Sequence, residues 1–476
     1  MKDFSDRVRG KLQMSSFRKK FIGDKAFYAM VLSVAVPIMI QNGITNFVSM
    51  LDNIMVGQMG TEPMSGVAIV NQLLFVFNLC IFGATSGAGI FGAQFAGKKD
   101  YDGLRSTTQF KLIVCVLIFF VGLAVYKIGG SRLIALYLHE GSESGSIEET
   151  MKHGLDYMGV MLWGLLPFVL AQVYSSTLRE TGQTVVPMVA GISAVFVNLA
   201  LNYVLIFGHF GAPAMGVRGA ALATVISRFV ELVIIAAYAH THVERYAFME
   251  NLYTRWRIPG KLAQKITIQG MPLMLNEMLW SSGMAIMNQC YSTRGLDAVA
   301  AVNISSTISG VFSVVFMALG ASVGIIVGQK LGAGEMEEAR DADNKLIAFS
   351  VTSCIVVGVA LIGVSSLFPR IYNTSDTVRA IAGSLIRVIA LCLPLNAFAN
   401  ASYFTLRSGG KSGITFVFDS GFTWVVCAPV AFALSRLTSL PIVPLYACCA
   451  SLDIIKCALG YYFIKRGDWI NNLVTD

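Results

Sequence analysis

Four residues in the first half of the chain carry oxygen atoms within otherwise apolar sequence. Asp52 directly follows an apolar run, and Thr224 is the only hydroxyl in the segment Gly219–Thr224. Asn198 and Asn202 are four residues apart, so on a helix they share one face. Together they offer one carboxylate, two amide oxygens and one hydroxyl. Hard cations prefer oxygen ligands of this kind, whereas a proton needs only the carboxylate. We therefore predict a site for Na⁺ or H⁺ at Asp52, and no other metal site.

Each of these residues also has a purely structural interpretation. Asp52 can be a helix-end residue at a membrane interface. Asn198 and Asn202 can form hydrogen bonds between helices, as polar residues in membranes often do. Thr224 can donate to the carbonyl four residues before it, which is common for hydroxyls on apolar helices. The sequence leaves these alternatives open.

The second half contains a different set of acidic residues within apolar segments. Glu277 and its neighbour Asn276 follow Pro272, and Asp419 lies well inside a later apolar run. Neither acid has an obvious partner nearby in the sequence. We predict that Glu277, Asn276 and Asp419 bind a cationic organic group or serve as a second coupling site. The alternative for Asp419 is that it neutralises Arg387 across the helices.

Two further pairs of opposite charge occur within apolar runs, at a spacing of three residues. They are Asp453 with Lys456 and Arg228 with Glu231. Residues at this spacing are neighbours on a helix surface. We expect both to be structural ion pairs that lower the cost of placing charge in a membrane.

The composition predicts an all-α membrane protein. Apolar residues make up 55% of the chain and charged residues only 13%, against roughly 25% charged in an ordinary soluble domain. A membrane-spanning helix needs about 20 mostly apolar residues. Twelve such spans are expected, at 29–51, 66–88, 110–128, 155–176, 185–207, 217–239, 266–291, 298–326, 346–367, 380–404, 414–434 and 442–464. Almost no chain is left for a soluble catalytic domain.

The distribution of basic residues predicts the orientation. Most of the 36 lysines and arginines fall in the tails and in alternate connections, including Lys98, Lys99, Arg105 and Lys111. Cytoplasmic loops carry this excess, so both termini are expected in the cytoplasm and the protein in the plasma (inner) membrane. The net charge of +8 then reflects topology and anionic lipid rather than nucleic acid. The first apolar run is too long for a cleavable signal peptide.

The chain contains an internal repeat. At a constant offset of 235 residues, Pro37 aligns with Pro272, Gln94 with Gln329, and the register continues without a gap to Arg105. A second block aligns Leu178–Arg179 with Leu406–Arg407. Many transporters are built from such repeats, with a pathway between two similar halves. The expected division is a cytoplasmic tail 1–25, an N-lobe 26–240, a cytoplasmic linker 241–262, a C-lobe 263–467 and a cytoplasmic tail 468–476.

Prolines occupy matching places in the two repeats. Pro37 and Pro272 each lie within a predicted span. Proline removes a backbone hydrogen bond and bends a helix. We expect the helix with Pro37 to bend when Asp52 is neutralised, with a static kink as the alternative.

Several motifs carry a family resemblance in chain order. They are Leu51–Gly60 (LDNIMVGQMG), Gly89–Gly97 (GIFGAQFAG), Gly324–Gly334 (GIIVGQKLGAG), Arg179–Thr184, Asn198–Gly208 and Gly216–Thr224. The set resembles the multidrug and toxic compound extrusion (MATE) transporters. The resemblance implies twelve helices in two pseudo-symmetric six-helix bundles around a central cavity. It also implies antiport, in which amphipathic, often cationic compounds leave the cell in exchange for H⁺ or Na⁺.

The same resemblance assigns roles to the first set of residues. Asp52, Asn198, Asn202 and Thr224 match the positions of the family's N-lobe cation site. Some members carry a second acid where this chain has Asn202, so the coupling ion stays open. The second repeat does not reproduce the site, because Met287 stands at the place of Asp52.

The expected partners are small organic substrates and membrane lipids. The protein is expected to be a monomer, with no cofactor other than the coupling ion. The alternatives are a lipid-linked saccharide flippase of the same superfamily or a metabolite exporter. A channel is not favoured, because the sequence has no repeated loop that could form a selectivity filter. Enzymatic activity is not expected, because the sequence has no cluster of catalytic residues.

Overall fold

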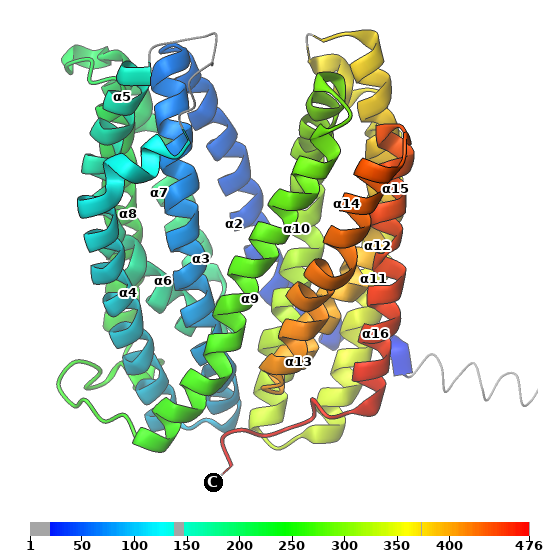
Figure 1. The fold of residues 1–476 in the computed structure, drawn as a ribbon. Coiled ribbons are helices and arrows are strands. Elements are labelled where there is room, and N and C mark those ends of the chain that lie inside the picture. Colours follow the sequence, from blue (N-terminus) through cyan, green and yellow to red (C-terminus); the bar gives the residue numbers. More distant parts are fainter. Residues whose placement is uncertain (1–19, 138–146, 373, 476) are drawn as a thin grey trace, which may run out of the picture. The chain divides into compact units, whose positions relative to one another are not determined.

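The computed structural model describes residues 20–137, 147–372 and 374–475. Most of the expected amino-terminal tail, residues 1–19, and the last residue of the carboxy-terminal tail therefore lie outside the described residues. The regular structure within the described ranges is helical. This confirms the predicted all-α fold class. Figure 1 shows the helices coloured along the chain.

The first repeat folds into helices that match the first six predicted spans. They are α2 (Lys25–Gly57), α3 (Thr61–Lys98), α4 (Tyr101–Ala135), α5 (Ile147–Met161), α6 (Leu165–Glu180), α7 (Val185–Phe207) and α8 (Val217–Thr241). The fourth span is divided into α5 and α6 by a single 3₁₀ turn, Leu162–Gly164.

The second repeat provides the other six spans. Its helices are α9 (Gly260–Ser292), α10 (Leu296–Gly332), α11 (Met336–Val364), α12 (Asp376–Ser408), α13 (Ser412–Phe416), α14 (Ala428–Leu437), α15 (Ile442–Ser451) and α16 (Asp453–Arg466). Two π-helical turns, Val417–Gly421 and Thr423–Cys427, join α13 to α14 in one span. In the last span α15 continues into α16 across Leu452.

Eleven helical segments of the described residues are long and apolar enough to cross a membrane. The remaining predicted span, 266–291, which is the seventh along the chain, does form a helix, α9, but it is less apolar than the others and is not among the eleven. The reason is its polar side chains, which include Gln269, Asn276, Glu277 and Asn288. Polar side chains at membrane depth usually face a cavity or a partner rather than lipid.

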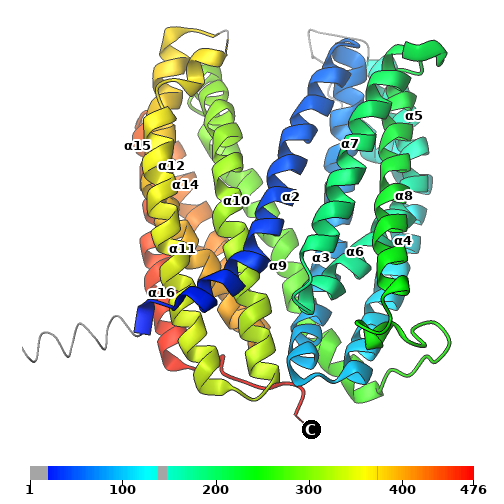
Figure 2. The same ribbon diagram turned by 180° about the vertical axis from the view of Figure 1, so that it is seen from behind.

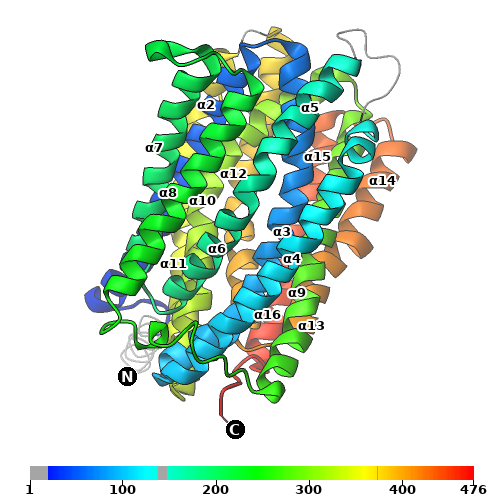
Figure 3. The ribbon, with the colours of Figure 1, turned by 90° about the vertical axis from the view of Figure 1, so that its left-hand side faces the viewer.

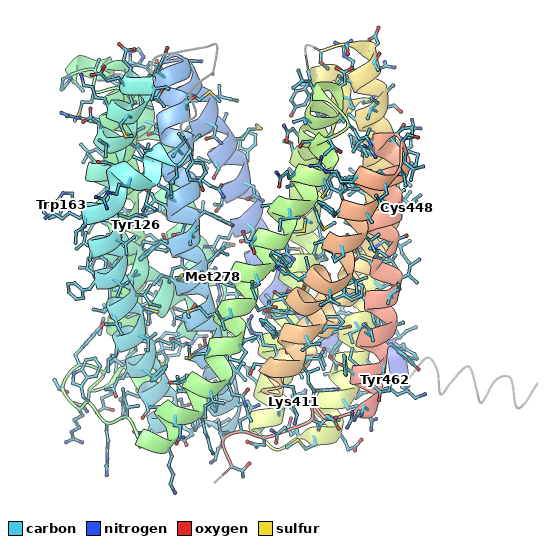
Figure 4. All side chains as sticks on the ribbon, viewed as in Figure 1. Tyr126, Trp163, Met278, Lys411, Cys448 and Tyr462 are labelled. Carbon is cyan, nitrogen blue, oxygen red and sulfur yellow. The ribbon has the colours of Figure 1, made fainter. Side chains whose placement is uncertain are left out.

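Large apolar side chains lie on the outside of the helices, where a soluble protein would place polar ones. Trp163, between α5 and α6, is 77% exposed, and Tyr462 on α16 is also exposed. Figure 4 shows both side chains pointing away from their helices. Extended apolar surface of this kind marks contact with a membrane or a partner, and the eleven candidate spans favour a membrane.

Contacts divide the chain into two compact units. Unit 1 contains the described residues up to Met39, the short segment Ala93–Lys99, and the chain from Leu279 onward. Unit 2 contains Ile40–Gly92 and Asp100–Met278. The helices α2, α3 and α9 therefore each pass from one unit to the other within their length. This is a division by contact, whereas the predicted lobes 26–240 and 263–467 are a division by sequence.

Unit 1 is built around α12, which packs along both α10 and α11. Figure 2 shows α11 beside α12. Its main core includes Leu331, Leu406 and Phe418, and the first part of α2 adds Val31 and Ala35 to the same core. The amino-terminal part of α2 is therefore packed by residues from the second repeat.

The ends of α3 and α10 cross in unit 1 with their backbones in contact. A side chain at Gly97 would collide with the backbone of Gln329, and one at Gly332 would collide with the backbone of Gln94. The two contacts are equivalent under the repeat, because Gln94 aligns with Gln329 and Gly97 aligns with Gly332. At this crossing the repeat detected in the sequence is a local pseudo-twofold in space.

Unit 2 is built around α8, which packs against α5, α6 and α7. Figure 3 shows α7 and α8 side by side. The connection 241–262 is held on α4 by Gln109, whose side-chain amide donates to the carbonyls of Leu252 and Arg255 at 2.7 and 2.8 Å. The backbone N–H of Arg257 donates to the same side chain at 3.2 Å. The linker is therefore anchored on unit 2.

Both matched prolines lie inside continuous helices. Pro37 is within α2 and Pro272 within α9. Pro37 lies two residues before the point where α2 changes unit, between Met39 and Ile40. A bend that follows neutralisation of Asp52 stays a prediction.

The glycine crossing predicts a sharp effect of a single methyl group. Gly97→Ala should destabilise the protein by about 1–3 kcal/mol, because the new Cβ meets backbone, which cannot rotate away. Gly310→Ala on α10 is the matched control, since nothing lies within 4 Å of its Cβ position. This control should be neutral or stabilising by up to about 1 kcal/mol. The measurement is the apparent melting temperature of each purified variant. Equal melting temperatures would contradict the crossing.

Candidate cation-coupling site

All four residues of the predicted cation site meet within unit 2. Asp52 lies near the carboxy-terminal end of α2, one and a half turns before the helix ends at Gly57. Asn198 and Asn202 lie one turn apart on α7 and are 6% and 2% exposed. Thr224 lies on α8, which packs along α7. Three helices therefore bring together groups that are far apart in the sequence.

Asp52 accepts a strong hydrogen bond from α7. The Nδ2 atom of Asn202 donates to Oδ1 of Asp52 at 2.7 Å. A hydrogen bond to an ionised acceptor is about twice as strong as a neutral one. This contact fixes the carboxylate of α2 against α7.

The amide of Asn198 fits the site best with its nitrogen toward Asp52. In that orientation Nδ2 lies 2.9 and 3.1 Å from the two carboxylate oxygens, and Oδ1 accepts from the hydroxyl of Thr224 at 3.2 Å. In the opposite orientation Oδ1 accepts from Asn202 and Nδ2 donates to Thr224, both at 3.2 Å. The first arrangement gives the carboxylate two amide donors. The second turns an amide oxygen toward the carboxylate, as a bound cation would require.

One oxygen in the site has no hydrogen-bond partner. Oδ1 of Asn202 is buried and unpaired, although buried polar atoms are almost always hydrogen-bonded. Such an atom is a ready ligand for a cation. The carboxylate of Asp52, this amide oxygen and the rotatable amide of Asn198 are three of the four oxygen-bearing groups that the sequence predicted, and the hydroxyl of Thr224 is the fourth. Clusters of three or more His, Cys, Asp or Glu side chains suited to a divalent metal do not occur among the described residues.

The structural alternatives apply to part of this site. Thr224 does donate to the carbonyl of Ala220 at 3.1 Å, as its alternative predicted. The asparagines do form hydrogen bonds between helices, but both are directed at Asp52. Asp52 itself is half-buried and bonded to α7, which does not fit a solvated helix-end residue.

A further polar pair borders the site and was not predicted. The hydroxyl of Tyr157 on α5 donates to Oδ1 of Asn71 on α3 at 3.2 Å. Tyr157 also interacts with Asp52 and Thr224. A tyrosine in an apolar run gives no distinct sequence signal, so only the packing of α5 on α8 reveals it.

The candidates on α9 lie in the part of that helix that belongs to unit 2. Asn276 is fully buried and Glu277 is half-buried. Both residues have interaction partners within the protein. A role for either in binding a substrate or a second coupling ion stays a prediction.

Asp419 forms an ion pair in unit 1. Its Oδ1 lies 2.6 Å from Nζ of Lys456, with both side chains largely buried. The expected partner, Arg387, instead donates to the hydroxyls of Ser365 and Ser366 at 3.4 and 3.3 Å. The suggestion that Asp419 neutralises Arg387 is therefore wrong. Lys456 rather than Arg387 pairs with Asp419, because its ammonium extends from α16 to the π-helical turn that carries Asp419.

The two short-range pairs also differ from expectation. Lys456 pairs with Asp419 rather than with Asp453, which acts on it only through a longer electrostatic interaction. Arg228 donates to the carbonyl of Gly164 at 3.2 Å. Glu231 interacts electrostatically with both Arg179 and Arg228. Neither pair is self-contained, because tertiary partners compete with the neighbour three residues away.

The most deeply buried ion pair joins Lys111 to Glu180. The Lys111 ammonium lies 2.6 Å from both carboxylate oxygens and also donates to the hydroxyls of Ser176 and Thr177. The lysine side chain is fully buried. Lys111 was counted among the basic residues of the cytoplasmic side, and the structure adds that its ammonium is buried in an ion pair. Its position inside the apolar run 110–128 was the available signal for burial.

Comparison with known proteins identifies the family. The family model MatE matches residues 37–204 and 272–433, which is more than half of the chain. The chain is a member of the MATE family. The two matched segments begin at Pro37 and Pro272, the same register as the internal repeat. The family resemblance of the motifs is thereby confirmed.

Curated relatives cover nearly the whole chain. A probable multidrug resistance protein NorM of Thermotoga maritima is 26% identical over 448 residues, or 92% of each protein. The multidrug resistance protein PmpM of Pseudomonas aeruginosa is 25% identical over 406 residues, covering 85% of this chain and 83% of PmpM. MATE proteins are membrane transporters, so this chain is a multi-pass membrane transporter.

Solved structures support the fold. The outward-facing conformation of a multidrug resistance MATE family transporter of the MOP superfamily matches with a TM-score of 0.83 at 18% identity. That match covers 92% of this chain and 95% of the other. A MOP superfamily transporter from Pyrococcus furiosus matches with a TM-score of 0.79. The twelve-helix MATE fold predicted from the sequence is confirmed.

The buried pair Lys111–Glu180 predicts a non-additive effect on stability. Lys111→Met leaves a buried carboxylate without a counter-ion and should cost about 3–5 kcal/mol. The double variant Lys111→Met/Glu180→Gln should recover most of that loss. The exposed pair Arg218–Asp156, at 2.8 Å, is the control, and Arg218→Ala should cost less than about 1 kcal/mol. Melting temperatures and folded yields measure all three. A Lys111→Met variant as stable as Arg218→Ala would show that Glu180 does not depend on the lysine.

Proposed function

We propose that this protein is a secondary antiporter that exports amphipathic, often cationic organic compounds in exchange for H⁺ or Na⁺. The observation that carries the proposal is the cluster in unit 2. A single carboxylate, Asp52, is held by two amides beside an unpaired amide oxygen. The names of the curated relatives, which are multidrug resistance proteins, support the substrate class.

The geometry suggests how the ion acts. When the site is empty, Asp52 is ionised and the amides of Asn202 and Asn198 donate to it. Protonation removes the charge that these donors stabilise and weakens their hold on α2. A bound Na⁺ has the same effect if the amides rotate to present oxygen. In either case the contact between α2 and α7 changes, which couples the ion to the arrangement of the helices.

Export requires that ion and substrate favour different states of the transporter. A ligand shifts a conformational equilibrium only by its difference in affinity for the two states. We propose that neutralisation of Asp52 lowers the affinity for the organic compound, which then leaves outward. Glu277, Asn276 and Asp419 stay candidates for holding that compound or for a second coupling step.

The buried lysines give no support to the lipid-linked saccharide flippase. Such a protein would offer uncompensated positive charge to an anionic headgroup. Lys111 and Lys456, the buried lysines with ion-pair partners, are each neutralised by a carboxylate at 2.6 Å. Metabolite export by the same mechanism stays the second candidate, because the coupling site is indifferent to the organic cargo.

The proposed setting is the inner membrane, with both ends of the chain in the cytoplasm and with lipid as the main environment. The protein should work as a monomer, with the coupling ion as its only cofactor. The basic residues at the ends of α3 and α10, Lys98, Lys99 and Lys330, support a cytoplasmic location for these helix ends.

The first test is Asp52→Asn in proteoliposomes loaded with a fluorescent cationic dye. Gradients of Na⁺ and of pH are imposed separately. The wild type should export dye under at least one gradient. Asp52→Asn should reduce export to the level of protein-free vesicles, because the amide is always neutral and cannot take up and release a proton. A melting temperature close to the wild type shows that the variant is folded. Undiminished export by Asp52→Asn would remove Asp52 from the mechanism.

The second test adds a charge to the site. Asn202→Asp places a second carboxylate beside Asp52, which should raise affinity for a metal cation. The Na⁺ concentration that half-stimulates dye export should fall by roughly tenfold, as for about 1.4 kcal/mol of added cation binding. Asn202→Leu, which has no charge and no oxygen, is the control and should weaken coupling to either ion. An unchanged Na⁺ dependence in Asn202→Asp would indicate that the site takes only a proton.

A further inference from the structure

The carboxy-terminal segment Gly467–Thr475 is docked on unit 1 rather than extending from it. Trp469 is 1% exposed and its ring N–H donates to the carbonyl of Ile464 at 3.1 Å. Val474 is also buried. Figure 1 shows the segment, in red, leaving α16 and running along the ends of the unit's helices. A segment of only nine residues with a buried tryptophan and valine is held by specific contacts.

Gln94 supplies the central contact. Its side chain is fully buried at the end of α3. Nε2 donates to the carbonyls of Ser408 at 3.0 Å and Asn471 at 3.1 Å, and Oε1 accepts from the N–H of Leu473 at 2.7 Å. One glutamine therefore joins α3, the end of α12 and the carboxy-terminal segment.

The segment also contacts both helices of the glycine crossing. Lys98 of α3 donates to the carbonyl of Val474 at 3.0 Å, and Asn472 donates to the carbonyl of Gly332 of α10 at 3.3 Å. The Asn472 side chain in turn accepts from the N–H groups of Val474 and Thr475 at 3.0 and 3.1 Å. The segment thus bridges the two helix ends that touch at Gly97 and Gly332.

We propose that Gln94 and the segment Gly467–Thr475 form a clasp that keeps the ends of α3 and α10 together, and that the clasp must release when these ends separate during transport. Gln94 is the positioning residue of the clasp. The inference rests on the proposed function, because alternating access needs the cytoplasmic ends of helices to part in one state.

The chemistry suits a device that opens and closes. Besides the buried side chains of Trp469 and Val474, the clasp consists of a few hydrogen bonds at helix ends next to basic residues, and water can replace these bonds on release. Elements that move in a working cycle come from the less stable parts of a protein.

Hydrogen–deuterium exchange of the full-length protein in nanodiscs tests the clasp directly. Gln94→Ala should speed exchange roughly tenfold or more in the segment 468–475, and also in the helix ends 93–99 and 328–334. Gln94→Glu keeps the acceptor for Leu473 but turns a carboxylate oxygen toward the carbonyls of Ser408 and Asn471, so it should speed exchange at least as much as Gln94→Ala. Removal of residues 468–476 should speed exchange in the helix ends even if Gln94→Ala folds poorly. Thr475→Ala is the matched control in the same segment, because its side chain is exposed and its backbone bond is kept.

The outcomes separate the clasp from the proposed function. If the segment is released while exchange in the helix ends is unchanged, the clasp does not hold the crossing and the inference fails. If the helix ends open in Gln94→Ala but its dye export keeps the wild-type half-saturating concentration and maximal rate, the clasp does not gate transport. A several-fold change in either kinetic constant, absent in Thr475→Ala, supports it. If the wild type exports no dye under any gradient, the antiport proposal fails, and the exchange data alone decide whether the clasp holds the helix ends.

Discussion

The constraint on which this structure depends is that charged and polar groups at membrane depth must find partners within the protein. Hydrocarbon offers neither hydrogen bonds nor counter-ions, so each unpaired group costs several kcal/mol. Lys111 meets the constraint with Glu180, and Lys456 meets it with Asp419. Asp52 meets it differently, because its partners are neutral amides. Neutral donors do not cancel the charge of a carboxylate, which supports the proposed role of Asp52 in taking up a cation.

The two repeats share backbone geometry but not side-chain chemistry. Gly97 and Gly332 make reciprocal contacts where α3 crosses α10, so that part of the ancestral packing persists. Thr177 and Thr405 occupy equivalent places, yet the first hydrogen-bonds the ammonium of Lys111 and the second the carboxyl of Asp343. The same threonine position thus serves opposite charges. Divergence of this kind explains why Met287 replaces Asp52 and why the coupling cluster occurs in one unit.

The proposed function needs contacts that keep each unit folded and other contacts that can change between two states. The buried ion pairs Lys111–Glu180 and Lys456–Asp419 fix the helices within each unit. Asp52, the rotatable amide of Asn198 and the clasp at Gln94 are held by a few hydrogen bonds that one proton, one ion or water can replace. In a membrane transporter the first group preserves the fold while the second allows two states. The passage of α2 from one unit to the other connects the two groups along a single helix.

The sequence by itself determined the helical membrane class, the twelve spans, the repeat and the oxygens of the Asp52 site, because apolar run length, a constant register and helical spacing are local properties. The sequence also indicated α9 as a span, although its polar residues make α9 the least apolar of the twelve spans. Only the tertiary structure decided which charges pair. Lys111 is buried against Glu180, Asp419 binds Lys456 rather than Arg387, and Gln94 binds a segment more than 370 residues away. The physical reason is that the partner of a buried polar group depends on which side chains of the neighbouring helices face it. A residue three positions away on the same helix is only one of the available partners.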